Sequence, residues 1–356
     1  MPDILVIGAG IAGLSAAARL SETANVTVIE AETSIGYHAS GRSAALIEQN
    51  YGAPSVQALN RASVDYLSDG QYLSPRGLMI LAQAHERESY EKDIAVLGTT
   101  PISIAEALAF VPVLDAEKLA FAAYHEDAQD IDTDLLLQDF ARTLRQNGGT
   151  IETGSRVDKI QRDAGTWQVT ASTKAFEAPI LVNAAGAWAD QVAQIAGVAP
   201  LGITPHRRSM ARIPAPGGHD ISKWPMFFGV NETWYAKPDA GCMLVSPADE
   251  DPVEPHDAWA EDLTLAQGLA LYEEMVTEPV TRLLSSWAGL RSFAPDRTLV
   301  LGRDPEHPEF VWCAGQGGYG FQTAPAAARL LTNLVEGRTP ELGAQTIAAL
   351  MPDRLR

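Results

Sequence analysis

The chain has 356 residues, of which 46% are hydrophobic and 20% charged, and no tract is repetitive or compositionally biased. This predicts a globular protein of one or two domains with a large core. A formal net charge of −19 disfavours binding to nucleic acid or to anionic membrane surfaces. Two cysteines are too few for a disulfide framework, and no histidine spacing indicates a bound metal. Without a basic leader or a long apolar run, we expect no transmembrane segment and a cytoplasmic location.

The N-terminal segment has the pattern of a dinucleotide-binding unit. An apolar strand expected over 4–7 runs into Gly8-Ala9-Gly10-Ile11-Ala12-Gly13, and a helix is expected over 14–20. The first glycine allows a tight turn, the second lets the backbone approach a pyrophosphate, and the third lets helix and strand pack closely. The free N–H groups at the start of the helix favour phosphate. A second strand over 25–29 ends at Glu30, which is placed to accept hydrogen bonds from a ribose.

The middle of the chain alternates between helical and extended patterns. A loop of small residues at 36–45, containing Arg42, stands where an NAD-binding domain would continue with another helix and strand. Helices are expected over 55–66, 85–97 and 135–145, the last with Thr133 as its N-cap. Strands are expected over 78–82, 148–152 and 157–160.

The second half contains an alternating region between two segments rich in small residues. An apolar strand over 180–183 ends in Asn183-Ala184-Ala185-Gly186-Ala187-Trp188. Residues 208–213, 227–230, 233–237 and 242–246 alternate apolar and polar, which predicts a mostly antiparallel sheet, and a helix is expected over 265–276. A strand over 310–314 then leads into a glycine-rich turn at 315–323 and a helix over 324–336, whose amides could face a ligand.

On these segments the chain resembles the D-amino-acid oxidase-like superfamily of FAD-dependent amine oxidoreductases, over nearly its whole length. The resemblance implies an α/β fold with a Rossmann-like FAD-binding domain of the glutathione-reductase type (1–72, 130–205 and 291–356). It also implies a substrate domain with a mixed, mostly antiparallel sheet (73–129 and 206–290). No cysteine matches the family's covalent attachment site, so we expect non-covalent FAD. The residues expected to bind it are Gly8, Gly10, Ile11, Ala12, Gly13, Glu30, Ala31, Ala39, Ser40, Gly41, Arg42, Ser43, Ala44, Ala45, Val157, Ala185, Gly186, Trp188, Gly317, Gly318, Tyr319, Gly320, Phe321, Gln322 and Thr323.

A carboxylate clamp is expected near the flavin. Arg291 stands in an otherwise apolar stretch just before the last FAD segment, and a planar guanidinium matches two carboxylate oxygens. By resemblance, Arg291 and Tyr235 match the family's carboxylate-binding pair, and Arg208 matches a second arginine of bacterial D-arginine dehydrogenases. Neighbouring Arg207 alternates to the opposite face of the strand. The carbonyl of Gly318 would accept a hydrogen bond from the substrate amine.

The side-chain pocket departs from the D-arginine enzymes. Their loop ends in Tyr-Gly, as Tyr51 and the following glycine do here, but residues 46–50 differ. The position of their guanidinium-binding acid is occupied by Leu78, and burying a guanidinium without a carboxylate is costly. Leu78, Met226 and Phe228 suit a neutral or apolar substrate. Glu48 on the loop could supply the missing negative charge, so a basic substrate remains an alternative.

The resemblance therefore implies FAD-dependent oxidative deamination of a D-amino acid to an imine, which water hydrolyses to a 2-oxo acid and ammonia. Residues 242–246 lack the lysine that promotes oxygen reduction in sarcosine-oxidase-like members, which favours a dehydrogenase with a quinone or carrier as acceptor. The alternatives are oxidation of glycine- or sarcosine-like amines, oxidation of a 2-hydroxy acid with a histidine base, and a non-catalytic FAD-binding protein.

Overall fold

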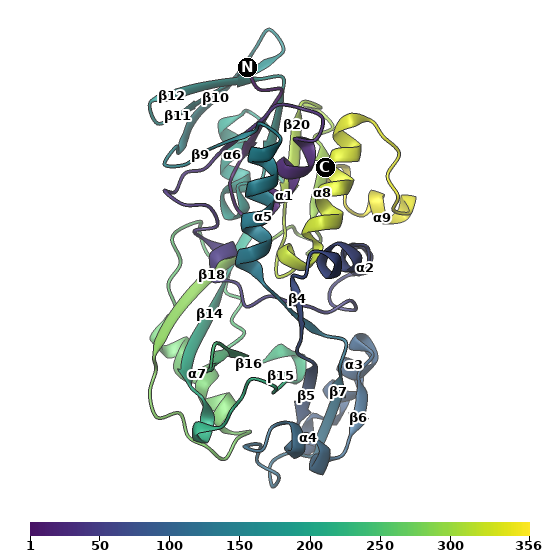
Figure 1. Ribbon diagram of the computed structural model, residues 1–356, viewed down its shortest axis with the longest axis vertical. Coiled ribbons are helices and arrows are strands. Elements are labelled where there is room, and N and C mark those ends of the chain that lie inside the picture. The colour runs from purple at the N-terminus through teal and green to yellow at the C-terminus, as the bar shows by residue number, and fades with distance from the viewer.

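The computed structural model describes residues 1–356 and consists of two sheet-based parts, one above the other in Figure 1. The upper part contains a six-stranded sheet in the order β19-β20-β13-β1-β2-β9, parallel except for the antiparallel pair β19–β20. Its strands are β1 (Ile4–Ile7), β2 (Val26–Ile29), β9 (Thr150–Glu152), β13 (Ile180–Asn183), β19 (Val300–Arg303) and β20 (Phe310–Ala314). Most of these strands are buried on both faces, which explains their unbroken apolar sequences.

Two different layers cover the faces of this sheet. On one face, Ile4 and Val6 pack with the helices that Figure 1 shows in front: α1 (Ile11–Leu20), α5 (Thr133–Gln146) and α8 (Gly320–Glu336), beside α2 (Pro54–Asp69). On the other face, Leu5 and Ile7 pack with Trp167 and its neighbours. That second layer consists of α6 (Ala189–Ile195) and a three-stranded sheet of β10 (Val157–Asp163), β11 (Thr166–Ala171) and β12 (Lys174–Ala178). The alternation along β1 thus divides the core into two layers.

The lower part contains an eight-stranded sheet in the order β18-β14-β17-β16-β15-β5-β7-β6. All neighbours are antiparallel except β15 and β5. Its strands are β5 (Leu78–Ala82), β6 (Thr100–Ile102), β7 (Phe121–His125), β14 (Thr204–Pro214), β15 (Met226–Gly229), β16 (Tyr235–Asp239), β17 (Cys242–Ser246) and β18 (Ser285–Phe293). The helices of this part are α3 (Arg87–Leu97), α4 (Ile104–Phe110) and α7 (Asp262–Glu273).

A small sheet connects the two parts, and one short helix follows α8. The small sheet has the order β3-β8-β4 and consists of β3 (Leu46–Ile47), β4 (Leu73–Pro75) and β8 (Gln129–Ile131). Near the C-terminus the chain forms α9 (Ala344–Ala348). The α/β fold and the mixed, mostly antiparallel second sheet predicted from the sequence are confirmed.

Several predicted boundaries are wrong. The N-cap of α5 is Asp132 and not Thr133, because the Asp132 carboxylate accepts a hydrogen bond from the Leu135 N–H at 2.9 Å and the helix already begins at Thr133. The predicted helix over 85–97 is a short 3-10 turn followed by α3. The strand expected at 208–213 is longer in the structure, where β14 begins at Thr204 and ends at Pro214. Its early start is explained by β18, which the sequence pattern did not reveal and which pairs with β14 from Thr204 onward.

None of the helices combines the length and hydrophobicity needed to cross a membrane. No group of three His, Cys, Asp or Glu side chains is arranged to hold a metal ion. Both cysteines, Cys242 and Cys313, are free thiols.

Candidate functional site

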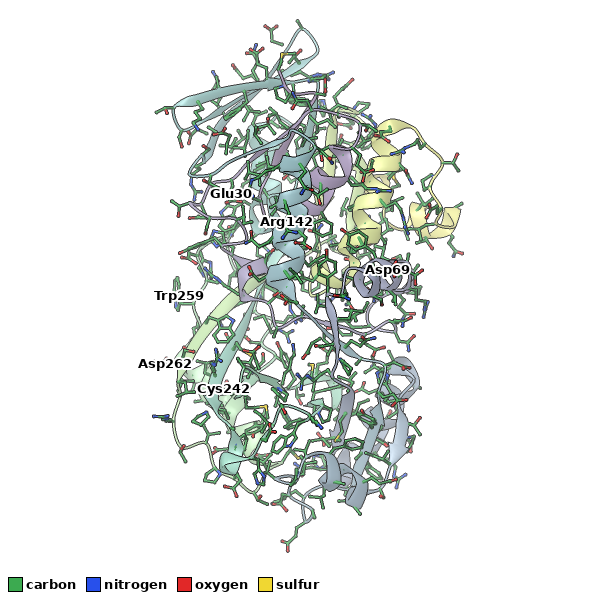
Figure 2. The ribbon with its side chains drawn as sticks, in the orientation of Figure 1. Glu30, Asp69, Arg142, Cys242, Trp259 and Asp262 are labelled. Atoms are coloured by element: carbon green, nitrogen blue, oxygen red, sulfur yellow. The ribbon has the colours of Figure 1, made fainter.

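One large cavity takes its walls from both parts of the molecule. In the upper part it is lined by the segments that follow β1, β2, β13 and β20, on the side where ligands bind in open α/β sheets. In the lower part it is lined by residues of β5, β14, β15, β16 and β18. Figure 2 places Glu30 in the upper part and shows Trp259, which is 65% exposed, projecting from the left margin.

The turn after β1 requires glycine at two positions. Gly8 has a φ of +103°, and a Cβ there would overlap the carbonyl oxygen of Ala184 on the neighbouring segment. A Cβ at Gly13 would overlap the carbonyl oxygen of Gly8, so any side chain would push α1 away from the strand. The close helix–strand packing predicted from the spacing is therefore present.

Backbone amides at the start of α1 face the cavity. The Glu30 carboxylate accepts hydrogen bonds from the N–H groups of Ala9 at 2.6 Å and Glu32 at 2.9 Å, which holds the glycine-rich turn against the end of β2. The N–H groups of Gly10 and Ala12, both in the cavity wall, have no hydrogen-bond acceptor in the protein. Two unpaired amides at a helix N-terminus form an anion-binding arrangement.

The loop at 36–45 crosses the cavity and is anchored from both sides. The Ser40 hydroxyl accepts a hydrogen bond at 2.9 Å from the N–H of the first residue of α1. The Arg42 guanidinium pairs with Asp257 and donates to the carbonyl oxygens of Ala258 and Ala288 at 2.8 and 2.9 Å. Arg42 thus attaches the loop to the lower part, and the hydrogen bonds of its side chain are all made within the protein.

Lys237 on β16 supports the same loop from below. Its buried ammonium forms an ion pair with Asp130 at 2.8 Å and donates to the carbonyl oxygens of Ala44 and Ala45 at 3.3 and 3.2 Å. The sequence analysis missed this residue, because nothing in the local pattern indicates which segment a buried lysine contacts. No lysine lies in the cavity wall.

Arg291 is a cation without a paired anion. Its side chain makes no hydrogen bond, and no carboxylate oxygen lies within 4 Å of it; the guanidinium lies against Gly318, where an added Cβ would be 3.0 Å from Cζ. Burial by itself lowers the pKa of Arg291, but nearby Tyr51, Tyr235 and Glu232 outweigh it and raise the pKa above its usual value. The wall therefore presents a permanent positive charge available to a ligand.

Arg208 and Arg207 point to opposite faces of β14, as the alternation predicts. Arg208 lines the cavity, is 9% exposed, and contacts Glu250 at 3.1 Å, while its Nε and Nη1 are buried without a partner. Arg207 instead pairs with Asp249, Asp251 and Glu261 outside the cavity. Arg291 on β18 is the register partner of His206 on β14, and Arg208 lies two residues further along β14. The two arginines are therefore diagonal neighbours on one face of the sheet.

Glu232 brings a negative charge into the same wall and was missed by the sequence analysis. The Tyr51 hydroxyl donates to one of its carboxylate oxygens at 3.0 Å, and the other oxygen has no hydrogen-bond donor in the protein. Asn231 and Glu232 both adopt left-handed backbone conformations, with φ of 56° and 53°. Contacts from Asn231 to Asp93 and Ser89 of α3 hold this uncommon turn in place.

One part of the wall combines three apolar side chains with one carboxylate. Leu78 and Met226 are register partners on β5 and β15, and Phe228 lies two residues further on. Glu48 also lines the cavity, but its carboxylate is 2.6 Å from the His125 imidazole. Burial lowers the pKa of His125, but the Glu48 carboxylate outweighs that effect and raises it overall.

Comparison with known proteins agrees with this geometry. Residues 3–334 match the family model described as DAO, FAD dependent oxidoreductase. The chain belongs to this family. The bovine (Bos taurus) FAD-dependent oxidoreductase domain-containing protein 1 is 23% identical over 94% of this chain and 81% of its own length. A D-amino acid dehydrogenase of Cereibacter sphaeroides is 38% identical, but only over 20% of this chain and 16% of its own. Glycine oxidase from Geobacillus kaustophilus has the same fold, with a TM-score of 0.84 and 21% identity over 98% of both chains.

The residues present fit the FAD that this family uses. The unpaired amides of Gly10 and Ala12, the loop at 36–45 and the clamp residues line one continuous cavity, so a dinucleotide and a substrate have adjoining places. At Gly186, also in the wall, φ is +54° and an added Cβ would meet no atom within 4 Å, so the backbone here leaves the space free.

The cavity is lined by every residue predicted to contact the substrate: Arg291, Tyr235, Arg208, Gly318, Tyr51, Glu48, Leu78, Met226 and Phe228. Of the residues predicted for FAD, Gly13, Gly41, Tyr319 and Thr323 do not line it. Thr323 is fully buried and its hydroxyl donates to the Tyr319 carbonyl oxygen, so it stabilises the start of α8. Besides Glu232, the wall includes residues for which the sequence predicted no role: Leu46, Leu97, Met210, Trp287, Leu290 and Gln316.

Proposed function

We propose that this DAO-family protein catalyses FAD-dependent oxidative deamination of a neutral D-amino acid. The observation that carries the proposal is the charge pattern of one wall: Arg291 has no anionic partner, and Glu232 keeps one carboxylate oxygen free. These charges are complementary to a zwitterion. We choose the D configuration because of the similarity to D-amino acid dehydrogenases, which covers 20% of this chain.

FAD would occupy the upper part without a covalent bond. In this proposal the six-stranded sheet and its helices form the FAD-binding domain, and the eight-stranded sheet forms the substrate domain. Gly10 and Ala12 would donate their free N–H groups to the pyrophosphate, and Glu30 would meet the ribose. When bound, the flavin supplies the two-electron acceptor for the Cα–H bond.

The clamp would fix the substrate by both charges. Arg291 and Arg208 bind the carboxylate, with Tyr235 beside them, and Glu232 with the Gly318 carbonyl oxygen receives the ammonium. The free oxygen of Glu232 can accept a proton from this ammonium, which leaves the nitrogen lone pair available as Cα is oxidised to the imine. Tyr51 holds Glu232 in the orientation that this transfer needs.

The apolar wall favours a neutral side chain. The side chains of Leu78, Met226 and Phe228 offer no hydrogen-bond partner to a guanidinium, and the Glu48 carboxylate already lies 2.6 Å from the His125 imidazole. A substrate such as D-leucine or D-methionine would bury its side chain here without leaving a charge unpaired.

We further propose that the electron acceptor is a quinone or carrier protein and not oxygen. The cavity wall contains no lysine, and the buried ammonium of Lys237 is fully engaged by Asp130 and two carbonyl oxygens. A 2-hydroxy acid substrate is less well supported, because the two histidines of the wall already have partners. His38 contacts Glu32, and His256 contacts the Glu254 carbonyl oxygen.

The deciding experiment is anaerobic reduction of the FAD-loaded protein by matched amino acids. We expect D-leucine and D-methionine to bleach the flavin absorbance faster than D-arginine, glycine, sarcosine or lactate, and L-leucine to leave it unchanged. Reoxidation by an artificial quinone should exceed reoxidation by oxygen. Bleaching by lactate alone, or by L-amino acids alone, would contradict the proposal, and a protein that cannot be loaded with FAD would remove its basis.

A further inference from the structure

Glu250 lies just outside the cavity between two arginines. Arg297 donates from Nη2 to both carboxylate oxygens at 2.8 Å, whereas Arg208 reaches only one of them, at 3.1 Å. Arg297 does not line the cavity and Arg208 does. The carboxylate is therefore shared unequally, with its closer contacts directed away from the cavity.

The position of Arg297 is determined by its surroundings. Its guanidinium lies 3.9 Å from the centroid of the Phe293 ring. The backbone N–H of Arg297 donates to the Ala294 carbonyl oxygen at 2.8 Å, in a turn where Arg297 has a φ of 60°. A cation stacked on an aromatic face is held by electrostatic attraction as well as by packing. The loop after β18 thus delivers a cation to Glu250.

The unequal sharing leaves Arg208 with unsatisfied donors. Its Nε and Nη1 are buried without a hydrogen-bond partner, although the side chain is only 9% exposed. Buried polar groups are ordinarily paired, and an unpaired buried cation is more costly still. Arg208, Arg291 and Arg297 carry three positive charges beside the two carboxylates of Glu250 and Glu232, so an anion in the cavity meets an excess of positive charge.

We propose that Arg297 is a positioning residue for substrate carboxylate recognition: by engaging both oxygens of Glu250, it keeps Arg208 available to the substrate. The inference rests on the proposed function, in which Arg208 binds the substrate carboxylate. Without the Arg297 cation, Glu250 is free to pair with Arg208 through two hydrogen bonds and to compete with the substrate for it.

The test compares carboxylate binding to FAD-loaded variants by flavin absorbance titration at fixed ionic strength. Two probes are used: acetate, and 2-aminoisobutyrate, an amino acid with no Cα hydrogen to lose. Arg297→Met keeps an apolar side chain against Phe293 but removes the charge, and should raise both Kd values about tenfold or more, the loss of one charge-assisted hydrogen bond. Arg297→Lys should restore Kd to within about threefold of wild type.

Glu250→Gln separates competition from a general loss of positive charge. It should lower Kd on its own, and in its presence Arg297→Met should change Kd by less than about twofold, because the competing carboxylate is gone. Flavin content should be equal in all variants. An unchanged Kd in Arg297→Met, or a double variant as weak as Arg297→Met alone, would overturn the inference. If acetate follows the expected pattern while no amino acid reduces the flavin, the inference holds and the proposed function fails.

Discussion

Replacing Arg291 by methionine should separate catalysis from stability. The wild-type guanidinium makes no hydrogen bond and has no carboxylate within 4 Å, so its removal breaks no close ion pair of the protein. Loss of a buried charge-assisted pair with the substrate costs about 2–5 kcal/mol, which corresponds to a roughly 30- to 5,000-fold decrease in kcat/KM. The midpoint of thermal unfolding should change little, because the substitution breaks no hydrogen bond or close ion pair within the protein.

Arg207→Met provides the matched control for Arg291→Met. Arg207 is also an arginine of this sheet, but it lies on the face of β14 that points away from the cavity. Arg207 and Asp249 form a buried pair at 3.2 Å with side-chain exposures of 8% and 5%. Breaking it should lower the free energy of unfolding by about 3 kcal/mol and leave kcat/KM within about threefold of wild type.

Both variants are assayed by steady-state turnover of D-leucine with an artificial acceptor and by urea unfolding of the FAD-loaded protein. The reasoning is refuted if Arg291→Met retains near wild-type kcat/KM, or if it destabilises the protein as much as Arg207→Met does. Equal flavin content in the two variants would show that neither change acts through the cofactor.

Three further changes test other parts of the site. Gly13→Ala should lower the unfolding free energy by about 3 kcal/mol and reduce the flavin-to-protein ratio, because its Cβ overlaps a backbone oxygen, whereas Gly343→Ala, in open space, should be neutral. His125→Gln should remove stabilisation that is complete below pH about 6.5 and is lost as pH rises through the elevated pKa of His125; equal urea-unfolding differences at acid and alkaline pH would contradict pairing with Glu48. Leu78→Glu should raise the kcat/KM of D-arginine relative to D-leucine about tenfold and cost about 2 kcal/mol of stability; an unchanged ratio in the turnover assay would move the side-chain pocket elsewhere.

Local patterns in the sequence were sufficient for the nucleotide unit. The turn at Gly8 and the short helix–strand distance at Gly13 follow from local spacing, although the atom that a Gly8 side chain would meet, the Ala184 carbonyl oxygen, lies on a distant segment. The opposite orientations of Arg207 and Arg208 likewise follow from the alternation of side chains along a strand. Features of this kind have a fixed spacing, so they can be read without knowing the fold.

The electrostatics of the pocket depended on the tertiary structure. Glu232 meets Tyr51 across 181 positions of sequence, and its left-handed backbone has no local signal because glutamate rarely adopts that conformation. Glu48 is a free carboxylate in the sequence but is paired with His125 in the fold. Sequence patterns alone identified the turn after β1 and the face of β14 on which Arg208 lies. Which charges remain unpaired there was decided by the packing of distant segments, since only packing brings partners of opposite charge within hydrogen-bonding distance.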